Sequence, residues 1–165
     1  MAKTRADLIA YLDRLGIAAT THDHPAVFTV EEARRHCGHL PGCHCKSLFL
    51  KDKKGGVWLV VARDVARVDL KALARRLGVG NVSFGKPDLL AEVLEVIPGA
   101  VTPFGLINDG ERRVRVVLES RMMDSALVNY HPLDNDASTA ITPADLIRFI
   151  EATGHGHQTL DLDAP

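Results

Sequence analysis

Two stretches decide the fold class of this chain: CKSLFLK at residues 45–51 and VWLVVAR at residues 57–63. The five residues between them, Asp-Lys-Lys-Gly-Gly, have the composition of a tight turn, so the pattern predicts a β-hairpin. The second stretch is apolar on both faces, which is typical of a strand at the centre of a sheet. The hairpin therefore places a sheet at the centre of the fold.

Helical and extended patterns alternate irregularly around this hairpin. Capping residues and apolar spacing predict helices over 4–15, 30–36, 69–77, 87–95 and 142–154. Short extended segments are predicted at 17–21, 126–130 and 138–141, and a second hairpin pairs 106–108 with 114–118. The sequence thus predicts an α/β (α+β) protein with a mixed, partly antiparallel sheet packed by helices.

Length and composition fit one globular domain. The chain has 165 residues, of which 46% are hydrophobic and 25% charged. A chain of this length buries enough surface to fold without a disulfide or a metal. We expect residues 1–165 to form a single domain, with 155–165 as a loosely ordered tail.

Several function classes are disfavoured by composition. The net charge of −1 argues against a large sequence-independent grip on nucleic acid. The longest apolar run, Val57 to Ala62, is too short to cross a bilayer, and the first residues show no signal-peptide pattern. Three cysteines do not suggest a disulfide framework. We expect a cytoplasmic protein that makes no membrane contact.

A dense histidine and cysteine cluster precedes and enters the first strand. Imidazole and thiolate are the ligands that zinc prefers, but these spacings do not match a zinc knuckle or finger. A polar loop followed by a strand whose Cys45 is a small core residue explains the cluster better, and we expect no metal. Its members are His36, Cys37, His39, Cys43, His44 and Cys45.

Three other features could carry chemistry. Lys46 shares a strand face with Leu48 and Leu50, so its ammonium either reaches solvent or is held in a cleft beside an anion. The loop over residues 98–105 contains two prolines and two glycines, and such loops can present backbone N–H groups to a carbonyl or phosphate. His131 follows an apolar strand, where a histidine could act as a base or bind a ligand.

Common catalytic and nucleotide-binding motifs are missing. No GxSxG elbow precedes a helix, so Ser47, His131 and Asp136 are not predicted to form a triad. The sequence also contains neither a GxxxxGK[ST] phosphate loop nor a GxGxxG dinucleotide fingerprint.

Taken together and in order, these segments resemble the YbaK/ProX superfamily, whose members are free-standing relatives of the editing domain of bacterial prolyl-tRNA synthetase. The ending of the chain is similar to the alanine-specific prolyl-tRNA deacylase branch. The resemblance covers about Thr4 to His155. It is carried by residues 42–50, 99–103, 131–133, 135–136, 138–141 and 143–146.

The resemblance implies a trans-acting aminoacyl-tRNA deacylase that hydrolyses Ala-tRNA of proline without a metal or other cofactor. Its partners would be the acceptor end of that tRNA and, in the cell, prolyl-tRNA synthetase. The resemblance assigns the reaction to Lys46, Gly99 and His131. It assigns substrate contacts to Ser47, Thr102, Pro103, Asn135 and Asp136.

Two positions depart from that branch. The family lysine commonly has threonine before it and asparagine after it, whereas this chain has Cys45 and Ser47. Serine keeps a hydroxyl but lacks an amide donor, which leaves the preferred amino acid open. The alternatives are a deacylase of the same fold for Cys-, Ser- or Thr-tRNA, or a non-catalytic module that binds tRNA or a synthetase. The sequence does not predict an oligomeric state.

Overall fold

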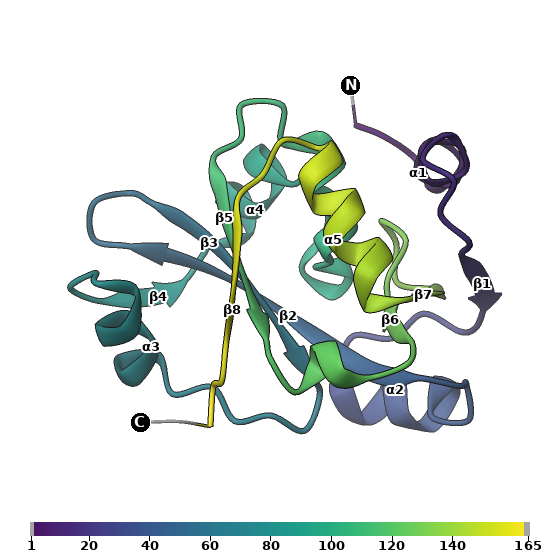
Figure 1. The fold of residues 1–165 in the computed structure, drawn as a ribbon, viewed down its shortest axis with the longest axis horizontal. Coiled ribbons are helices and arrows are strands. Elements are labelled where there is room, and N and C mark those ends of the chain that lie inside the picture. Colours follow the sequence, from purple (N-terminus) through teal and green to yellow (C-terminus); the bar gives the residue numbers. More distant parts are fainter. Residues whose placement is uncertain (1, 164–165) are drawn as a thin grey trace.

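The computed structural model describes residues 2–163, which form a mixed sheet with helices on both faces (Figure 1). The strand order is β1-β7-β6-β2-β3-β5-β8, and β4 pairs with β2 beside this path. Pairing is parallel in β2/β6, β3/β5 and β5/β8 and antiparallel elsewhere. The predicted fold class is therefore confirmed. The strands are β1 (Thr20–Asp23), β2 (Cys43–Asp52), β3 (Val57–Arg63), β4 (Val82–Phe84), β5 (Val114–Glu119), β6 (Val128–Tyr130), β7 (Ala137–Ile141) and β8 (His157–Leu160).

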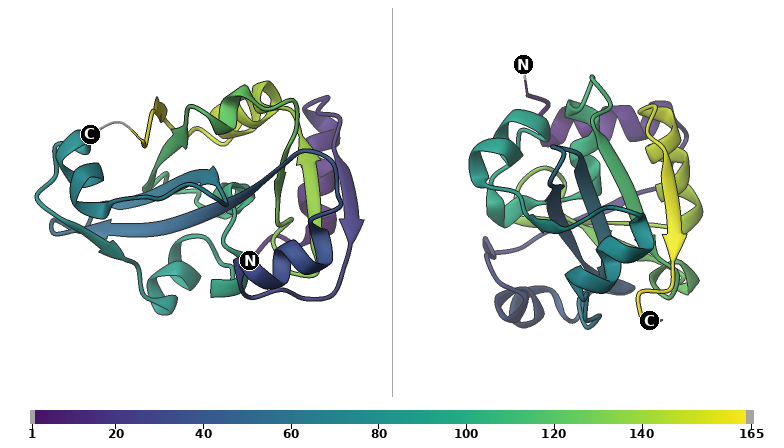
Figure 2. Two further views of the ribbon diagram at one scale, coloured as in Figure 1. Left: turned by 90° about the horizontal axis from the view of Figure 1, so that it is seen from below. Right: turned by 90° about the vertical axis from the view of Figure 1, so that its left-hand side faces the viewer.

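The central hairpin forms as predicted. Cys45 pairs with Arg63 and Lys51 with Val57, and β3 is buried on both faces between β2 and β5. The first two residues of β2 instead pair with β6, so this long strand joins the two parts of the sheet. Figure 2 shows the hairpin reaching from the β6–β7 region toward α3.

Local capping fixes the helices close to their predicted positions. Thr4 and Asp7 form a capping box at the start of the first helix. Asp69 caps the third helix, which Gly78 ends at a φ of 72°. Thr142 caps the last helix. The helices are α1 (Arg5–Arg14), α2 (Val30–Cys37), α3 (Leu70–Leu77), α4 (Pro87–Val93) and α5 (Pro143–Ala152).

Two apolar clusters lie on opposite faces of the β3–β5 region because side chains alternate along a strand. The larger cluster joins Leu59 and Val116 to apolar residues of α1, α4 and α5. The smaller one joins Trp58 and Val60 to α3. At the other end of β2, α2 packs beside β6 and β7 (Figure 2), and the pocket described below lies there.

The predicted second hairpin is wrong. Residues Pro103–Asn108 form a 3₁₀ helix, and β5 pairs with β3 and β8 rather than with a preceding strand. Thr102 caps this short helix by accepting a hydrogen bond from the backbone N–H of Phe104. A turn-like Asp109-Gly110 sequence therefore follows a helix, not a strand.

The expected loose tail is also wrong for the described residues. Strand β8 extends the sheet beside β5, and the Ser120 N–H donates to the Leu160 carbonyl at 2.8 Å. The buried His155 imidazole contacts the Asp109 carboxylate at 2.9 Å. Backbone pairing and this buried contact hold the segment in place. Residues 164–165 of the expected tail lie outside the described residues.

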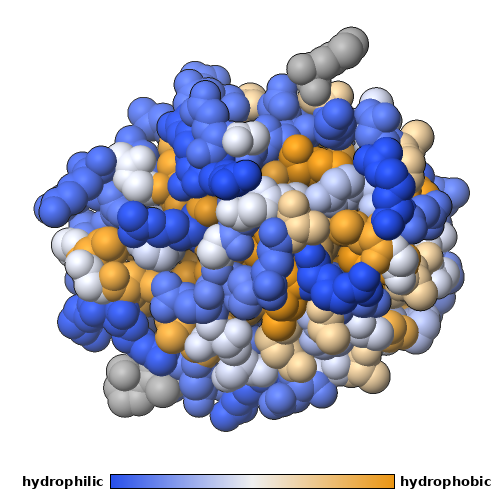
Figure 3. All heavy atoms as spheres, turned by 45° about the horizontal axis from the view of Figure 1, so that its top comes forward, coloured by the Kyte–Doolittle hydropathy of each residue, from blue (hydrophilic) through white to orange (hydrophobic). Residues whose placement is uncertain are grey.

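The face of the molecule in Figure 3 is mostly hydrophilic, with smaller hydrophobic groups between the polar ones. Among residues 2–163, none of the helices combines the length and apolar character that a bilayer crossing requires.

Candidate functional site

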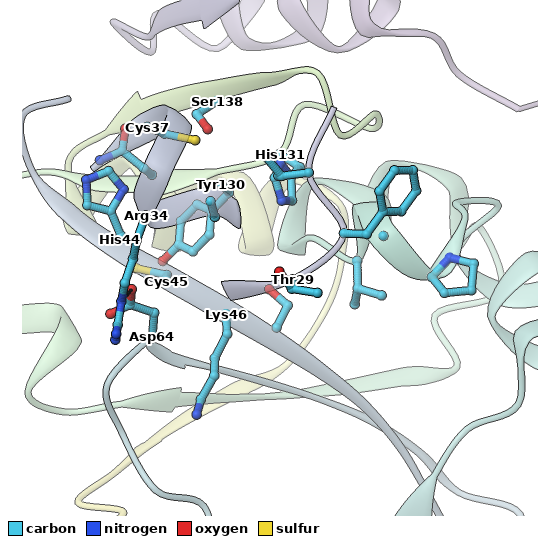
Figure 4. Close-up of a pocket in the computed structure, with 18 residues that line it drawn as sticks. Thr29, Arg34, Cys37, His44, Cys45, Lys46, Asp64, Tyr130, His131 and Ser138 are labelled. Carbon is cyan, nitrogen blue, oxygen red and sulfur yellow. Dashed lines mark hydrogen bonds and ion pairs between the residues drawn. The ribbon is translucent and has the colours of Figure 1, made fainter. Parts of the chain in front are cut away.

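A pocket opens between α2, the start of β2, strands β6 and β7, and the loop after α4 (Figure 4). Its cavity volume is about 160 Å³, small against the ~300–1,000 Å³ that is usual for drug-sized ligands. Four predicted site residues line this pocket although they are far apart in the sequence. They are Lys46, Ser47, Gly99 and His131.

Lys46 lies half-buried at the mouth of the pocket. Its ammonium donates a hydrogen bond to the carbonyl of Ala66, in the loop after β3. Figure 4 shows the side chain extending away from His131 and Ser138. A cation held at a pocket rim by one carbonyl keeps two donors for an incoming anion.

The loop at Gly99 supplies an unused backbone donor. Pro98 begins a short 3₁₀ helix, in which the Ala100 N–H donates to the Ile97 carbonyl. Among residues 2–163, the Gly99 N–H has no acceptor, and Gly99 lines the pocket. A backbone donor without a partner is expensive away from water, so this N–H is suited to bind an acceptor on a ligand.

Gly99 is also required for space. A Cβ at this position would lie 2.9 Å from the Phe28 ring and 3.2 Å from the Asn135 amide. The Phe28 side chain is 65% exposed and covers the loop at the edge of the pocket. A residue with a Cβ at this position would therefore have to displace the Phe28 ring.

His131 is fixed in one tautomer and kept neutral. Its Nδ1 lies 3.2 Å from the Ala137 carbonyl, which can only accept, so Nδ1 carries the proton. Burial lowers the pKa of His131 below its ordinary value, and the hydrogen bond to Ala137 opposes this only in part. Within the described part of the chain Nε2 makes no hydrogen bond, which leaves it as a free acceptor.

His24 and Ser138 form a pair that sequence reasoning missed. The His24 Nδ1 lies 2.8 Å from the Pro25 carbonyl, so its Nε2, 2.9 Å from Ser138 Oγ, accepts from that hydroxyl. Pairing of β1 with β7 places His22 opposite Ser138 and so brings His24 alongside. Figure 4 shows Ser138 beside Cys37 on the same pocket wall as His131.

The other predicted contacts support the pocket from outside its lining. Thr102 and Pro103 are buried beneath the loop. The Asn135 side-chain amide donates to the Val27 carbonyl at 3.0 Å, and the backbone carbonyl of Asn135 accepts from the Val27 N–H. It thereby holds the segment that carries Phe28. Their direct contact with substrate stays a prediction.

Asp136 is exposed and pairs with Arg5 of α1. The same guanidinium donates to both oxygens of Asp134, at 2.7 and 2.9 Å, and to Asp23 at 2.8 Å. These carboxylates raise the pKa of Arg5, with the Asp134 hydrogen bond as the largest cause. Arg5 therefore fixes the loop that follows His131, and Asp136 takes part in that support.

Asn129 contributes an unpaired acceptor to the pocket region. Its Nδ2 donates to the carbonyls of Pro41 and Cys43 at 2.9 and 3.3 Å. Its Oδ1 is buried without a hydrogen-bond partner within residues 2–163. Buried acceptors of this kind are few in native proteins and need an explanation.

The histidine and cysteine cluster does not converge on one point. Alternation along β2 sends His44 to one face of the sheet and Cys43 and Cys45 to the other. In the part of the chain that the structure describes, no three His, Cys, Asp or Glu side chains are placed to hold a metal ion.

Comparison with known proteins bears on the sequence and on the fold. The family model described as the aminoacyl-tRNA editing domain matches residues 24–149. A Danio rerio protein named prolyl-tRNA synthetase associated domain-containing protein 1 is 44% identical over 161 residues, covering 96% of this chain and 88% of the relative. The prolyl-tRNA editing protein ProX of Acetoanaerobium sticklandii is 35% identical over 156 residues, which cover 94% of this chain and 95% of the relative.

A solved structure supports the fold independently. A crystal structure described as a proposed trans-editing enzyme for prolyl tRNA synthetase superposes with a TM-score of 0.74. The alignment covers 98% of each chain at 22% sequence identity.

Proposed function

The chain belongs to the aminoacyl-tRNA editing domain family, and from this premise we propose that it hydrolyses the ester of alanine mischarged onto proline tRNA. In this proposal residues 1–165 act as one editing domain, and the reaction needs no metal. The observation that carries the proposal is the unpartnered backbone N–H of Gly99, a residue that lines a small pocket together with a cation and a neutral histidine.

Ester hydrolysis develops negative charge on the carbonyl oxygen, and fixed donors in a partly enclosed site stabilise that charge. We assign this role to the Gly99 N–H group. It lies in a loop that is stiffened by Pro98 and Pro103 and covered by Phe28, so it needs little rearrangement when the oxyanion forms.

His131 and Lys46 have complementary roles in the proposal. The His131 Nε2 accepts a hydrogen bond from the attacking water or from a hydroxyl of the terminal ribose, and so orients that group toward the ester carbon. Lys46 stands at the mouth of the pocket, where the phosphate that precedes the terminal nucleoside would enter. Its ammonium therefore binds the tRNA rather than the amino acid.

The amino acid specificity is proposed to come from the small pocket, which holds alanine and excludes the proline ring. Discrimination of one or two methylenes by binding alone is worth only about 1–3 kcal/mol each. Ser47 favours a second candidate, a deacylase for Cys-, Ser- or Thr-tRNA, because this residue lines the pocket and carries a hydroxyl, which can bind a polar side chain.

The test is a deacylation assay on proline tRNA charged with alanine, with Pro-tRNA as the control and Lys46→Ala as the matched variant. The proposal expects rapid loss of alanine, retention of proline and an inactive variant. Faster loss of cysteine, serine or threonine from the same tRNA supports the second candidate.

A hydrolysis rate equal to that in buffer for every charged tRNA contradicts both candidates. If the protein then still binds uncharged proline tRNA, it is a binding module without catalysis. Prolyl-tRNA synthetase is proposed as a partner in delivery, and its addition to the assay shows whether it changes the rate.

A further inference from the structure

Cys43 and Cys45 form a close thiol pair that the proposed reaction does not use. Both lie on β2 and face the larger apolar cluster, on the opposite side of the sheet from Lys46. Their Sγ atoms are 3.8 Å apart, and both thiols are free. Cys45 also borders the pocket.

The backbone geometry at this pair is compatible with a covalent link. Residues two apart on a strand are separated by about 6.6 Å, near the upper limit of about 6.8 Å for a disulfide. Strand β2 changes partner here, because Cys43 and His44 pair with β6 whereas Cys45 begins the pairing with β3. Twist in a strand shortens this separation further.

The two thiols differ in reactivity. Cys43 is half-buried, and the hydrogen bond from the Cys45 thiol lowers its pKa to about 7. The hydrogen bond to Cys43, together with burial, raises the pKa of Cys45. Cys43 is therefore the thiol of the pair that more readily forms the thiolate, the nucleophilic form, and Cys45 is its neighbour within reach.

We propose that Cys43 and Cys45 are an oxidisable dithiol site whose substrate is a hydroperoxide. The Cys43 thiolate attacks the terminal peroxide oxygen, the O–O bond breaks, and the leaving hydroxide or alkoxide takes up a proton. Cys43 is then a sulfenic acid. The Cys45 sulfur attacks the sulfenic sulfur and loses its proton, and the S–O bond breaks with release of water. Two thiols are oxidised to one disulfide, and the peroxide is reduced by two electrons.

Closing this bond affects the strand that carries Lys46. The sulfur atoms move from 3.8 Å to the covalent distance of about 2.0 Å, which draws Cys45 toward Cys43. Lys46 and Ser47 follow directly in the chain. We therefore expect oxidation to lower deacylation by at least about tenfold, since small displacements of site groups have effects of this size. This consequence rests on the proposed function.

The experiment treats the reduced protein with hydrogen peroxide and measures the mass of the peptide of residues 36–46, which trypsin releases by cleaving after Arg35 and after Lys46. That peptide contains Cys37, Cys43 and Cys45. The expected product has lost two hydrogen atoms, in the wild type and in Cys37→Ser alike. Cys43→Ser and Cys45→Ser do not form it. Deacylation by the oxidised wild type falls and recovers with dithiothreitol, whereas both serine variants resist peroxide.

A disulfide that involves Cys37, or a gain of oxygen without a disulfide, overturns the dithiol site. A Cys43–Cys45 disulfide that leaves deacylation unchanged overturns the link to Lys46. If the reduced protein hydrolyses no ester, the proposed function fails, and the peptide masses still decide whether the dithiol exists.

Discussion

The hairpin end of β2 and its pocket end differ in how their polar groups are hydrogen-bonded. At the hairpin end, the buried Asp52 carboxylate accepts from the backbone N–H groups of Lys54 and Gly56 at 2.9 and 2.8 Å. It also accepts from the Trp58 indole at 3.1 Å. Every donor that reaches Asp52 comes from its own turn and the neighbouring strand.

At the pocket end, several donors and acceptors have no hydrogen-bond partner among the described residues. Within residues 2–163, the Gly99 N–H, the His131 Nε2 and the buried Asn129 Oδ1 have no partner. An unmade hydrogen bond costs stability, so such groups persist where they serve a ligand. The surroundings of β2 thus contribute stability at its hairpin end, whereas at its pocket end β6 and the Gly99 loop contribute binding capacity. The following predictions test that division.

The largest effect is expected from Lys46→Ala. Lys46 is the one lysine among the described residues that lines the pocket, and its loss is expected to lower kcat/KM for Ala-tRNA of proline at least about 100-fold. Lys51→Ala is the matched control, because Lys51 lies exposed on the same strand outside this pocket. Equal deacylation rates for the two variants would show that Lys46 is not part of the functional site.

Gly99→Ala is expected to lower kcat/KM by about 10- to 100-fold, because the added methyl group displaces Phe28 and shifts the backbone donor. Gly110→Ala is the control, since a Cβ there meets nothing within 4 Å. Steady-state deacylation at equal protein concentration measures both. An active Gly99→Ala enzyme would exclude the loop from catalysis.

A smaller effect concerns pH. Burial lowers the pKa of His131, so the imidazole stays neutral at pH 7 and gains a proton only below its ordinary value of about 6.5. We expect kcat/KM to fall on acidification below that value. His131→Asn should lower the plateau about fivefold to tenfold and remove this acid limb. His157→Asn, on the remote β8, is the control and should keep the fall of kcat/KM at low pH. If this fall survives in His131→Asn, another group causes it.

The smallest effect on activity is expected at the hairpin end. Asp52→Ala leaves three donors unpartnered and should reduce the free energy of unfolding by about 3 kcal/mol, with kcat/KM unchanged. The Trp58 hydrogen bond is the largest cause that lowers the pKa of Asp52. The stability that the ionised Asp52 carboxylate contributes is therefore present above about pH 4, and it is lost as the pH falls through the lowered folded-state pKa of this group. Urea titrations of wild type and variant across this range measure the loss; parallel pH dependences would contradict it.

The parts of the fold that local chemistry determines could be predicted. Two helices could be predicted from their first residues, Thr4 with Asp7 and Thr142 before Pro143, because a helix cap is made within a few residues. The central hairpin followed from its turn and its apolar strands. Strand β8 was missed because His157–Leu160 has little apolar pattern, and its pairing with β5 is set by partners distant in the sequence.

The candidate site was predictable to a similar degree. Lys46, Gly99 and His131 were singled out by residue type and order, and the fold gathers them at one pocket. The His24–Ser138 pair was not found, because 114 residues separate the two and only the β1–β7 register brings them together. The unpartnered Asn129 Oδ1 depends on three-dimensional packing in the same way.

The most direct test of the account measures two quantities on the same preparations of Lys46→Ala and Asp52→Ala: single-turnover deacylation of Ala-tRNA of proline and the free energy of unfolding in urea. The account predicts that Lys46→Ala loses deacylation while its stability stays within about 0.5 kcal/mol of the wild type. It predicts that Asp52→Ala loses stability and keeps the wild-type rate. Parallel loss of both quantities in both variants would contradict the division between the two ends of β2.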